Sequence, residues 1–534
     1  MSSTVWSDVQ KLVRLTRDLP GFLRVPLSIE QARSTVERRL ARREERFLWL
    51  AERGIYGAAR SPYRRLLRIA GCELGDLKAL VAGNGLDGAL TQLAQAGVYL
   101  SLDEFKGRRA VVRGSQRFSV DEDDCDNPTI SAHVEAWSGG TRSPGTSVKM
   151  ALPYFTELAV NTLLALQTHG LADYEHAVWL QGFAVGFVYA ALGRRPAAWF
   201  YPVQPISTRM ALASWYMAVL SRLSGRPIPG PLFLDLREPQ KLVEWLADRR
   251  KSGKSVCVTA YASSAVRVCA AARERGVSLE GVCFVTLGEP FTEAKRRVVQ
   301  AAGAQALVRY AITELGIIGY GCGTAQESDD VHFFSDSYGL IQRPRSIGEC
   351  GLTVDAFYFT SLLRSAPKVV VNLESGDFGR LGRRSCDCAL GSIGLQDHIS
   401  EIRSFEKLSG EGMTFATTDL LHVLEERLPA RFGGSSSDYQ LIEQEDEQGI
   451  LRLHLIVSPS VRTGDDDQIR RTFLDELGRD GATANFGAVY WERAGTVEVR
   501  RRSPIATRAG KILPFHLLKS DGVAAPNGLP RADG

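Results

Sequence analysis

The chain has 534 residues, 44% hydrophobic and 24% charged, with a formal net charge of +4 at pH 7. This length predicts more than one domain, because single cores stop growing at about 250–300 residues. A nearly neutral charge over this length leaves no basic footprint, which argues against nucleic acid or an anionic membrane as a partner.

Neither export nor membrane insertion is predicted. The N-terminus lacks the basic start and apolar core of a signal peptide. The most apolar run, 177–192, contains Gln181, Gly182 and Gly186 and is shorter than the roughly 20 residues that span a bilayer. The nine cysteines are scattered rather than spaced as a disulfide scaffold. We therefore expect a cytoplasmic protein with reduced thiols.

The first segments predict helices. Residues 29–70 read as helical, and the mixed charges from Glu37 to Arg46 are typical of a solvated helix face. The segment SPYRRLLRIAG at 61–71 opens with Ser-Pro, which is a helix start signal. Acidic residues at 120–127 predict an exposed loop.

Strand-like and helical runs alternate between residues 150 and 320. Such alternation predicts a largely parallel α/β sheet, with ligand-binding segments at the carboxyl ends of its strands. After Ser404 the pattern changes to a short strand and helix at 412–428, a hairpin around Gln448-Gly449, a helix at 464–478 and a strand at 495–504.

We therefore predict an α/β protein: a large multi-sheet α/β N-terminal body with a small mobile α+β C-terminal domain. The expected boundaries are 1–404 for the body, 405–518 for the small domain and 519–534 for a disordered tail rich in Gly, Pro and Ala.

A loop and three later segments carry the chemistry. The stretch WSGGTRSPGT at 137–146 offers backbone amides and hydroxyls to phosphate oxygens, with no bulky side chains in the way. Alone, such a loop is more often a plain turn. It is followed in order by LGEP at 287–290, YAITELG at 310–316, ESGDFGRLG at 374–382 and Lys511 in TRAGK.

In this order and at these separations, the segments resemble the adenylate-forming superfamily of acyl-CoA synthetases, luciferases and adenylation domains. SPYRRLL at 61–67 resembles the opening of its phenylacetate-CoA-ligase-like branch. The resemblance implies an AMP-forming carboxylic acid ligase that uses ATP and Mg²⁺. It also implies a second step, in which the acyl group passes to a thiol after the small domain rotates.

The resemblance implies a role for each matching residue. The residues that contact ATP and its phosphates would be Ser138, Gly139, Gly140, Thr141, Gly288, Glu289, Pro290, Tyr310, Asp377 and Arg380. Among these, Tyr310 would stack on the adenine, and the two oxygens of Asp377 would bind the ribose diol. The catalytic residues would be Thr313, Glu314 as the Mg²⁺ ligand and Lys511 as the mobile lysine. Lys407 aligns with the hinge pivot.

Several positions depart from the family pattern. Arg142 replaces a glycine of the loop, Asn372 stands where an arginine usually precedes the ribose aspartate, and Phe405 stands where an arginine precedes the hinge. Arg142 and Asn372 favour a rival interpretation, a degenerate member that binds a nucleotide or acyl ligand without turnover. Retention of Glu314, Asp377 and Lys511 argues against it.

Taken singly, these residues have plainer interpretations. Tyr310 is a typical core residue, Asp377 could cap a helix, and Lys511 could be a surface charge. The ordered set is what favours the functional interpretation.

A second set of residues suggests a metal. The resemblance implies that Cys322, His332, Cys386 and Cys388 form one site, and three thiolates with one imidazole fit a closed, structural zinc site. A CxC pair alone is a weak signal. Reduced, partly buried thiols and a surface histidine remain an equal alternative.

The substrate and acceptor stay open. Apolar residues at 182–193 and 198–203 suit an aromatic or apolar carboxylic acid, but they suit a core equally well. The acceptor could be coenzyme A, the phosphopantetheine arm of an acyl carrier protein, a protein thiol or an amine. A homodimer is also left open.

Overall fold

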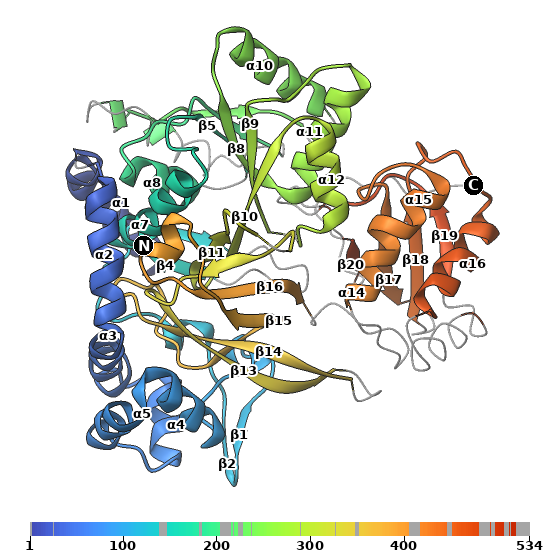
Figure 1. The fold of residues 1–534 in the computed structure, drawn as a ribbon. Helices are drawn as coiled ribbons and strands as arrows, with labels where there is room; N and C mark the ends of the chain where they lie inside the picture. The colour runs from blue at the N-terminus through green and yellow to red at the C-terminus, as the bar shows by residue number, and fades with distance from the viewer. Residues whose placement is uncertain are drawn as a thin grey trace.

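The structure is a computed structural model of mixed α/β type with one large sheet and a small C-terminal domain (Figure 1). It describes residues 3–24, 26–137, 147–180, 184–202, 215–216, 218–219, 221–222, 228–235, 238–288, 290–325, 327–347, 352–404, 417–445, 451–479, 492, 497–506, 512 and 514–518. No helix in these ranges is long and apolar enough to cross a membrane.

Twelve strands form the large sheet, in the order β13-β14-β15-β16-β12-β11-β10-β9-β8-β5-β6-β7. Their bounds are β5 (Glu175–Trp179), β6 (Ala198–Tyr201), β7 (Pro231–Phe233), β8 (Val256–Tyr261), β9 (Val282–Leu287), β10 (Gln305–Ile312), β11 (Gly316–Gly321), β12 (Val331–Phe333), β13 (Tyr338–Ile347), β14 (Leu352–Ser361), β15 (Leu373–Arg383) and β16 (Asp397–Ser404).

The sheet has a parallel half and an antiparallel half. From β7 to β10 every neighbouring pair is parallel, which confirms the prediction for these strands. From β10 to β13 every pair is antiparallel, a half that the alternating pattern did not predict. The change of direction falls at β10, which is parallel to β9 and antiparallel to β11.

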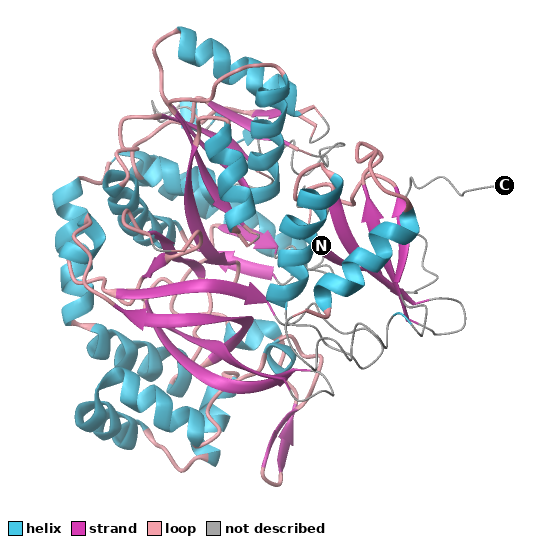
Figure 2. Cartoon of the chain, turned by 45° about the vertical axis from the view of Figure 1, so that its right-hand side comes forward, coloured by secondary structure: helices cyan, strands magenta, loops and turns pink. Residues whose placement is uncertain are grey.

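Helices cover both faces of the parallel half (Figure 2). On β8, Val256 and Val258 belong to the core shared with α10, α11 and α12, whereas Cys257 belongs to the core shared with α7 and α8. This two-sided burial explains why these strands read as continuous apolar runs. The helices are α7 (Leu152–Thr168), α8 (Ala184–Ala191), α10 (Pro239–Lys251), α11 (Ala262–Glu274) and α12 (Glu293–Ala301).

Most of the described residues of the apolar segments that were candidate walls of an acid pocket lie in this core. Phe187, Val188 and Tyr189 of α8 are buried, and so are Trp199 and Phe200 of β6. These side chains therefore serve the packing between the helices and the sheet.

The N-terminal helices line one side of the body (Figure 1). They are α1 (Ser3–Arg24), α2 (Ile29–Ala41), α3 (Arg43–Leu50), a π-helical segment η1 (Ala51–Tyr56), α4 (Pro62–Ile69), α5 (Leu74–Gln95) and α6 (Leu102–Phe105). The helix predicted from SPYRRLL is confirmed as α4, with Pro62 in its first turn.

The predicted solvated face of these helices is wrong for Arg39 and Arg46, which are only 5% and 7% exposed. Arg39 Nη1 lies 3.2 Å from Asp336 Oδ2, and Arg46 Nη1 donates to the Asp336 carbonyl at 3.2 Å. Burial lowers the pKa of Arg46 to about 10. Partners almost 300 residues away are not visible in a local charge pattern.

The acidic stretch 120–127 is also more than an exposed loop. It contains a short 3₁₀ turn, η2 (Glu122–Cys125), that buries Cys125. The fully buried Lys368 places its Nζ 2.6 Å from Asp126 Oδ1. Two small hairpins flank this turn, β1–β2 (Val111–Arg113 and Gln116–Phe118) and β3–β4 (Val134–Trp137 and Ser147–Met150).

Asn372, one of the departures from the family pattern, has a structural role. Its backbone adopts a left-handed φ of 51°, a conformation that asparagine tolerates better than most residues. Its buried Nδ2 donates to the carbonyls of Leu90 at 2.9 Å and Val98 at 3.1 Å. This position therefore fastens α5 and the following loop to the start of β15.

The small domain has its own sheet, in the order β19-β18-β17-β20, and its own hydrophobic core. Its elements are α14 (Thr417–His422), a π-helical turn η3 (Val423–Arg427), α15 (Leu428–Phe432), β17 (Tyr439–Glu445), β18 (Leu451–Val457), α16 (Asp466–Leu477), β19 (Val497–Arg501) and β20 (Phe515–Leu518). The predicted hairpin is confirmed, because β17 and β18 pair in antiparallel fashion up to Glu445 and Leu451. The strand predicted ahead of α14 lies outside the described residues.

Candidate functional site

The predicted site residues divide into those that the structure describes and those that it does not. Outside the described residues lie Ser138, Gly139, Gly140, Thr141, Glu289, Lys407 and Lys511. The described ones lie directly after β9, at the end of β10 and in the turn that follows it, on β15, and in a Cys/His cluster.

Tyr310 and Asp377 meet across the sheet. Tyr310 lies near the end of β10, and its hydroxyl donates to Asp377 Oδ2 of β15 at 2.9 Å. Both side chains are half-buried. Burial of the hydroxyl and the charge of Asp377 hold the pKa of Tyr310 well above its usual value. The tyrosine therefore stays protonated at neutral pH and orients the carboxylate.

The strand order explains this meeting of residues 67 positions apart. A bulge between Tyr310 and Ala311 interrupts the register of β10 with β11, and Asp377 lies inside β15 rather than at a helix cap. The backbone N–H of Asp377 donates to Ser375 Oγ at 3.2 Å, which further fixes the backbone that carries the carboxylate.

The turn after β10 carries Thr313 and Glu314. Thr313 is exposed, whereas Glu314 is buried and lies 3.9 Å from Lys106 Nζ. A single carboxylate at the edge of the site fits Mg²⁺, which binds proteins through one or two carboxylates together with substrate phosphates.

The other described residues of the nucleotide set lie at the surface. Gly288 directly follows β9 with a φ of 78°, a left-handed conformation that favours glycine. Pro290 lies in the segment between β9 and α12. Arg380 is 74% exposed and pairs with Glu401 at 3.0 Å.

The structure brings together Cys322, His332, Cys386 and Cys388. Their four ligand atoms all lie within 4.8 Å of one another. Cys322 Sγ is 3.3 Å from Cys386 Sγ, and Cys388 Sγ is 3.0 Å from His332 Nε2. Two ligands of a tetrahedral zinc ion lie about 3.8 Å apart, as Zn–S bonds of about 2.3 Å imply. The spacing and the donor set fit a closed structural site.

The surroundings of the cluster also fit a metal. His332 Nδ1 lies 2.8 Å from the Leu395 carbonyl, which selects the tautomer with Nε2 as the ligand atom. The backbone N–H groups of Thr324, Cys388 and Gly391 donate to the sulfurs of Cys322, Cys386 and Cys388, each at 3.4 Å. A Cβ at Gly391, in the short helix α13 (Ala389–Ser392), would lie 2.2 Å from the Cys386 carbonyl oxygen.

Behind the cluster, two aspartates tie it to β16, the last strand before the small domain. Asp330 Oδ1 lies 2.9 Å from His398 Nδ1, and the His398 ring lies 4.2 Å from that of His332. The carboxylate of Asp329 accepts the backbone N–H groups of Glu401 at 2.9 Å and Ile402 at 3.0 Å. Glu401 has a left-handed φ of 54°. The cluster therefore helps to fix the strand from which the small domain continues.

The sequence did not predict a buried contact between the two domains. Lys295 of α12 and Glu425 of η3 are 3% and 1% exposed at their side chains, and Lys295 Nζ lies 2.9 Å from Glu425 Oε1. The other carboxylate oxygen accepts from the Thr292 hydroxyl. Lys295 also donates to the Pro290 carbonyl at 2.7 Å. This contact links the LGEP segment directly to the small domain.

No protein-family model and no curated protein matches this sequence. Among solved structures, a 2-hydroxyisobutyryl-CoA ligase in complex with 2-HIB-AMP and CoA matches over 95% of this chain and 90% of its own, with 15% identity and a TM-score of 0.44. An anthranilate CoA ligase in complex with anthranoyl-AMP matches over 74% and 67%, with 12% identity and a TM-score of 0.44. A mutant of the amide bond synthetase Mcba from Marinactinospora thermotolerans matches over 90% and 97%, with 12% identity and a TM-score of 0.39.

The Cys/His cluster yields a metal-content prediction. Protein purified without chelator should contain about one zinc per chain, measured by elemental analysis. The double substitution Cys386→Ser and Cys388→Ser should release the metal and lower Tm, because metal binding to a folded site adds to folding free energy.

Cys72→Ser is the matched control, since Cys72 is a partly exposed thiol outside the cluster. It should keep both metal and Tm. Metal-free, folded wild-type protein that is indifferent to the double substitution would leave the four residues as packing groups.

Proposed function

We propose that the chain is an AMP-forming carboxylic acid ligase. In the reaction, an oxygen of the carboxylate substrate bonds to the α-phosphorus of ATP. The bond from that phosphorus to its bridging oxygen breaks, and pyrophosphate leaves with the electron pair. The products are an acyl-adenylate and pyrophosphate.

The pairing of Tyr310 with Asp377 is the observation that carries this proposal. Four segments of the sequence predicted a nucleotide site, and the residues from two of them, YAITELG and ESGDFGRLG, meet at 2.9 Å. The oriented carboxylate suits the two hydroxyls of a ribose. The half-buried ring of Tyr310 offers a face for the adenine.

The remaining roles follow from charge. Glu314 would hold Mg²⁺, which supplies positive charge to the phosphates when bound. Lys511 would bring a cation to the reacting oxygens, since two anionic reactants must approach each other. The loop 138–141 would donate backbone N–H groups to the leaving phosphates.

The second half-reaction would transfer the acyl group to a thiol, either coenzyme A or the phosphopantetheine of a carrier protein. Transfer to an amine is the competing possibility. The separate core of the small domain supports a rotation between the two steps, because a domain with its own core can move as a unit. The Lys295–Glu425 contact would hold one of the two orientations. The four-residue Cys/His cluster would hold neighbouring loops together and would have no catalytic role.

Asp377→Ala should weaken ATP binding. Loss of charge-assisted hydrogen bonds to the ribose costs about 1.5–3 kcal/mol, which is roughly a ten- to hundredfold rise in Kd. Calorimetric titration with ATP measures this directly. Asp397→Ala, on the neighbouring β16, is the control, and an unchanged Kd for Asp377→Ala would remove the ribose role.

Lys511→Ala should abolish adenylate formation and leave the fold intact. The measurement is pyrophosphate exchange into ATP across a panel of carboxylic acids, with circular dichroism to check folding. Lys519→Ala, near the same end of the chain, controls for loss of charge. Near-full exchange in the Lys511 variant would exclude this lysine from the mechanism.

Glu425→Gln should loosen the small domain from the body. The substitution leaves the ammonium group of Lys295 buried without its counter-charge, and breaking a buried pair costs about 3–5 kcal/mol. Hydrogen exchange should accelerate in two segments, 292–299 of the body and 423–428 of the small domain.

Glu426→Gln is the matched control, because Glu426 is the next residue and, within the part of the chain that the structure describes, its ion pair is the local one with His422 at 3.4 Å. It should leave both segments protected. Equal exchange in the two variants would show that Lys295 and Glu425 do not hold the domains together.

A further inference from the structure

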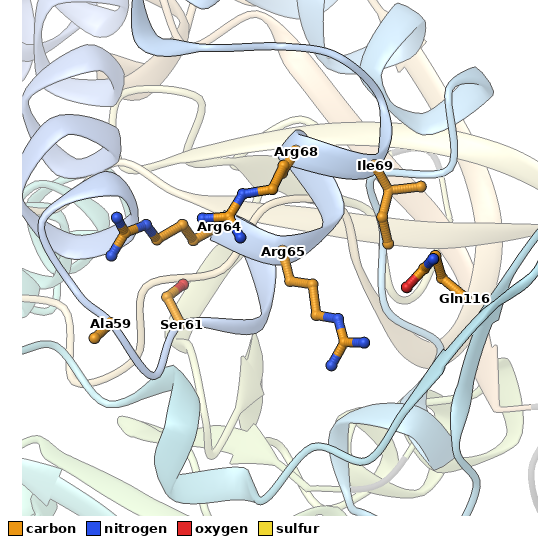
Figure 3. A pocket seen from close by; sticks show the side chains of 7 residues that line it. All are labelled: Ala59, Ser61, Arg64, Arg65, Arg68, Ile69 and Gln116. Atoms are coloured by element: carbon orange, nitrogen blue, oxygen red, sulfur yellow. The ribbon is translucent and has the colours of Figure 1, made fainter.

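Three arginines of α4 line an open hollow on the N-terminal part of the body (Figure 3). The hollow has a volume of about 760 Å³ and is lined by Ala59, Ser61, Arg64, Arg65, Arg68, Ile69 and Gln116. This volume lies within the roughly 300–1,000 Å³ of small-molecule sites. None of the lining residues belongs to the proposed adenylation site.

The helix carries these three charges on neighbouring turns, and Arg64 and Arg65 extend to opposite sides of Arg68 (Figure 3). Arg64 and Arg68 are four residues apart and Arg65 and Arg68 are three apart, so Arg68 has a like charge on each side of it along the helix surface. Such pairs destabilise a helix by about 0.2–0.5 kcal/mol each when no anion lies between them. An anion bound in the hollow would remove this repulsion.

Among the described residues, no carboxylate neutralises this cluster. Within the described ranges, neighbouring Arg60 pairs with Asp124 at 2.7 Å, but no ion pair forms to Arg64, Arg65 or Arg68. Arg65 instead lies over the Phe118 ring, 4.4 Å from its centroid, which orients its guanidinium group. Arg64 is half-buried, so part of its desolvation cost is already met in the folded protein.

We propose that this hollow, the α4 arginine site, binds a small anion that carries adjacent phosphoryl groups. Planar guanidinium groups bind phosphate oxygens in a bidentate manner, and neighbouring forks suit two linked phosphates. Ser61 and Gln116 add neutral hydrogen-bonding groups at the rim, and Ile69 offers an apolar contact for an organic moiety. Free pyrophosphate and a nucleoside diphosphate share this chemistry.

The test reads the site residue by residue. The full-length protein is treated with an arginine-selective dicarbonyl reagent, with and without pyrophosphate or ADP, and modification is located by peptide mass spectrometry. At about ten times Kd, modification of the three arginines should slow by about tenfold. Arg38 of α2 and Arg42, which follows α2, are also exposed and should react at an unchanged rate.

A variant links the protection to Arg68. Arg68→Ser should raise the ligand concentration that protects Arg64 by about tenfold or more, and Arg68→Lys should restore only part of the affinity. Circular dichroism of each variant confirms that α4 and the rest of the fold persist. If pyrophosphate or ADP still protects the three arginines in the Asp377→Ala variant, the α4 arginine site is distinct from the proposed ATP site.

Each outcome decides the proposal. Protection by pyrophosphate and ADP alike assigns the site to the phosphates, and protection by ADP alone assigns it to a nucleotide. Equal protection by chloride at matched ionic strength, or no protection by either ligand, would overturn the proposal. Equal slowing of Arg38 and Arg42 would also overturn it.

Discussion

The architecture depends on the two hydrogen-bonded edges of β10. One edge pairs in parallel with β9, and the other pairs antiparallel with β11, so two sheets of different type become one. The turn that makes this reversal possible carries Thr313 and Glu314, and the strand end before it carries Tyr310. The same order brings β15 into the sheet, with Asp377 within hydrogen-bonding distance of Tyr310. The candidate active site therefore lies where the sheet changes from parallel to antiparallel pairing.

The Cys/His cluster extends this organisation toward the small domain. Its ligands follow β11, lie on β12, and precede α13, while Asp329 and Asp330 join the same loops to β16. The same loop contacts the segment next to Pro290, because Ser328 Oγ donates to the Phe291 carbonyl at 2.9 Å. Lys295 connects Pro290 to Glu425 of η3. Among the described residues, contacts between the small domain and the body include this buried ion pair and the packing of Ala506 against the body core.

Local patterns in the sequence predicted local structure well. The apolar alternation predicted the parallel half of the sheet, Ser-Pro predicted α4, and the turn at Gln448-Gly449 predicted a hairpin. The four members of the Cys/His cluster were also predicted, although more than fifty residues separate His332 from Cys386. The prediction of the cluster relied on the order of motifs along the chain. Such an order can indicate which distant segments come together in the fold.

Contacts without a motif could not be predicted. Lys295 and Glu425 lie in ordinary amphipathic helical segments 130 residues apart, and each would suit a solvent-facing position. Arg39 and Arg46 belong to a typical surface charge pattern, yet both are buried and contact Asp336. In each case a charged residue is buried by a partner from a distant segment, and composition or periodicity carries no trace of that partner.

The central claim is that a carboxylate attacks the α-phosphorus of ATP. It is tested most directly with a carboxylic acid labelled with ¹⁸O in its carboxyl group, incubated with the enzyme, ATP, Mg²⁺ and an acyl acceptor. The account predicts one ¹⁸O atom in the AMP released and none in the pyrophosphate. Release of ADP with label in inorganic phosphate, or hydrolysis of ATP with no label in any product, would contradict it.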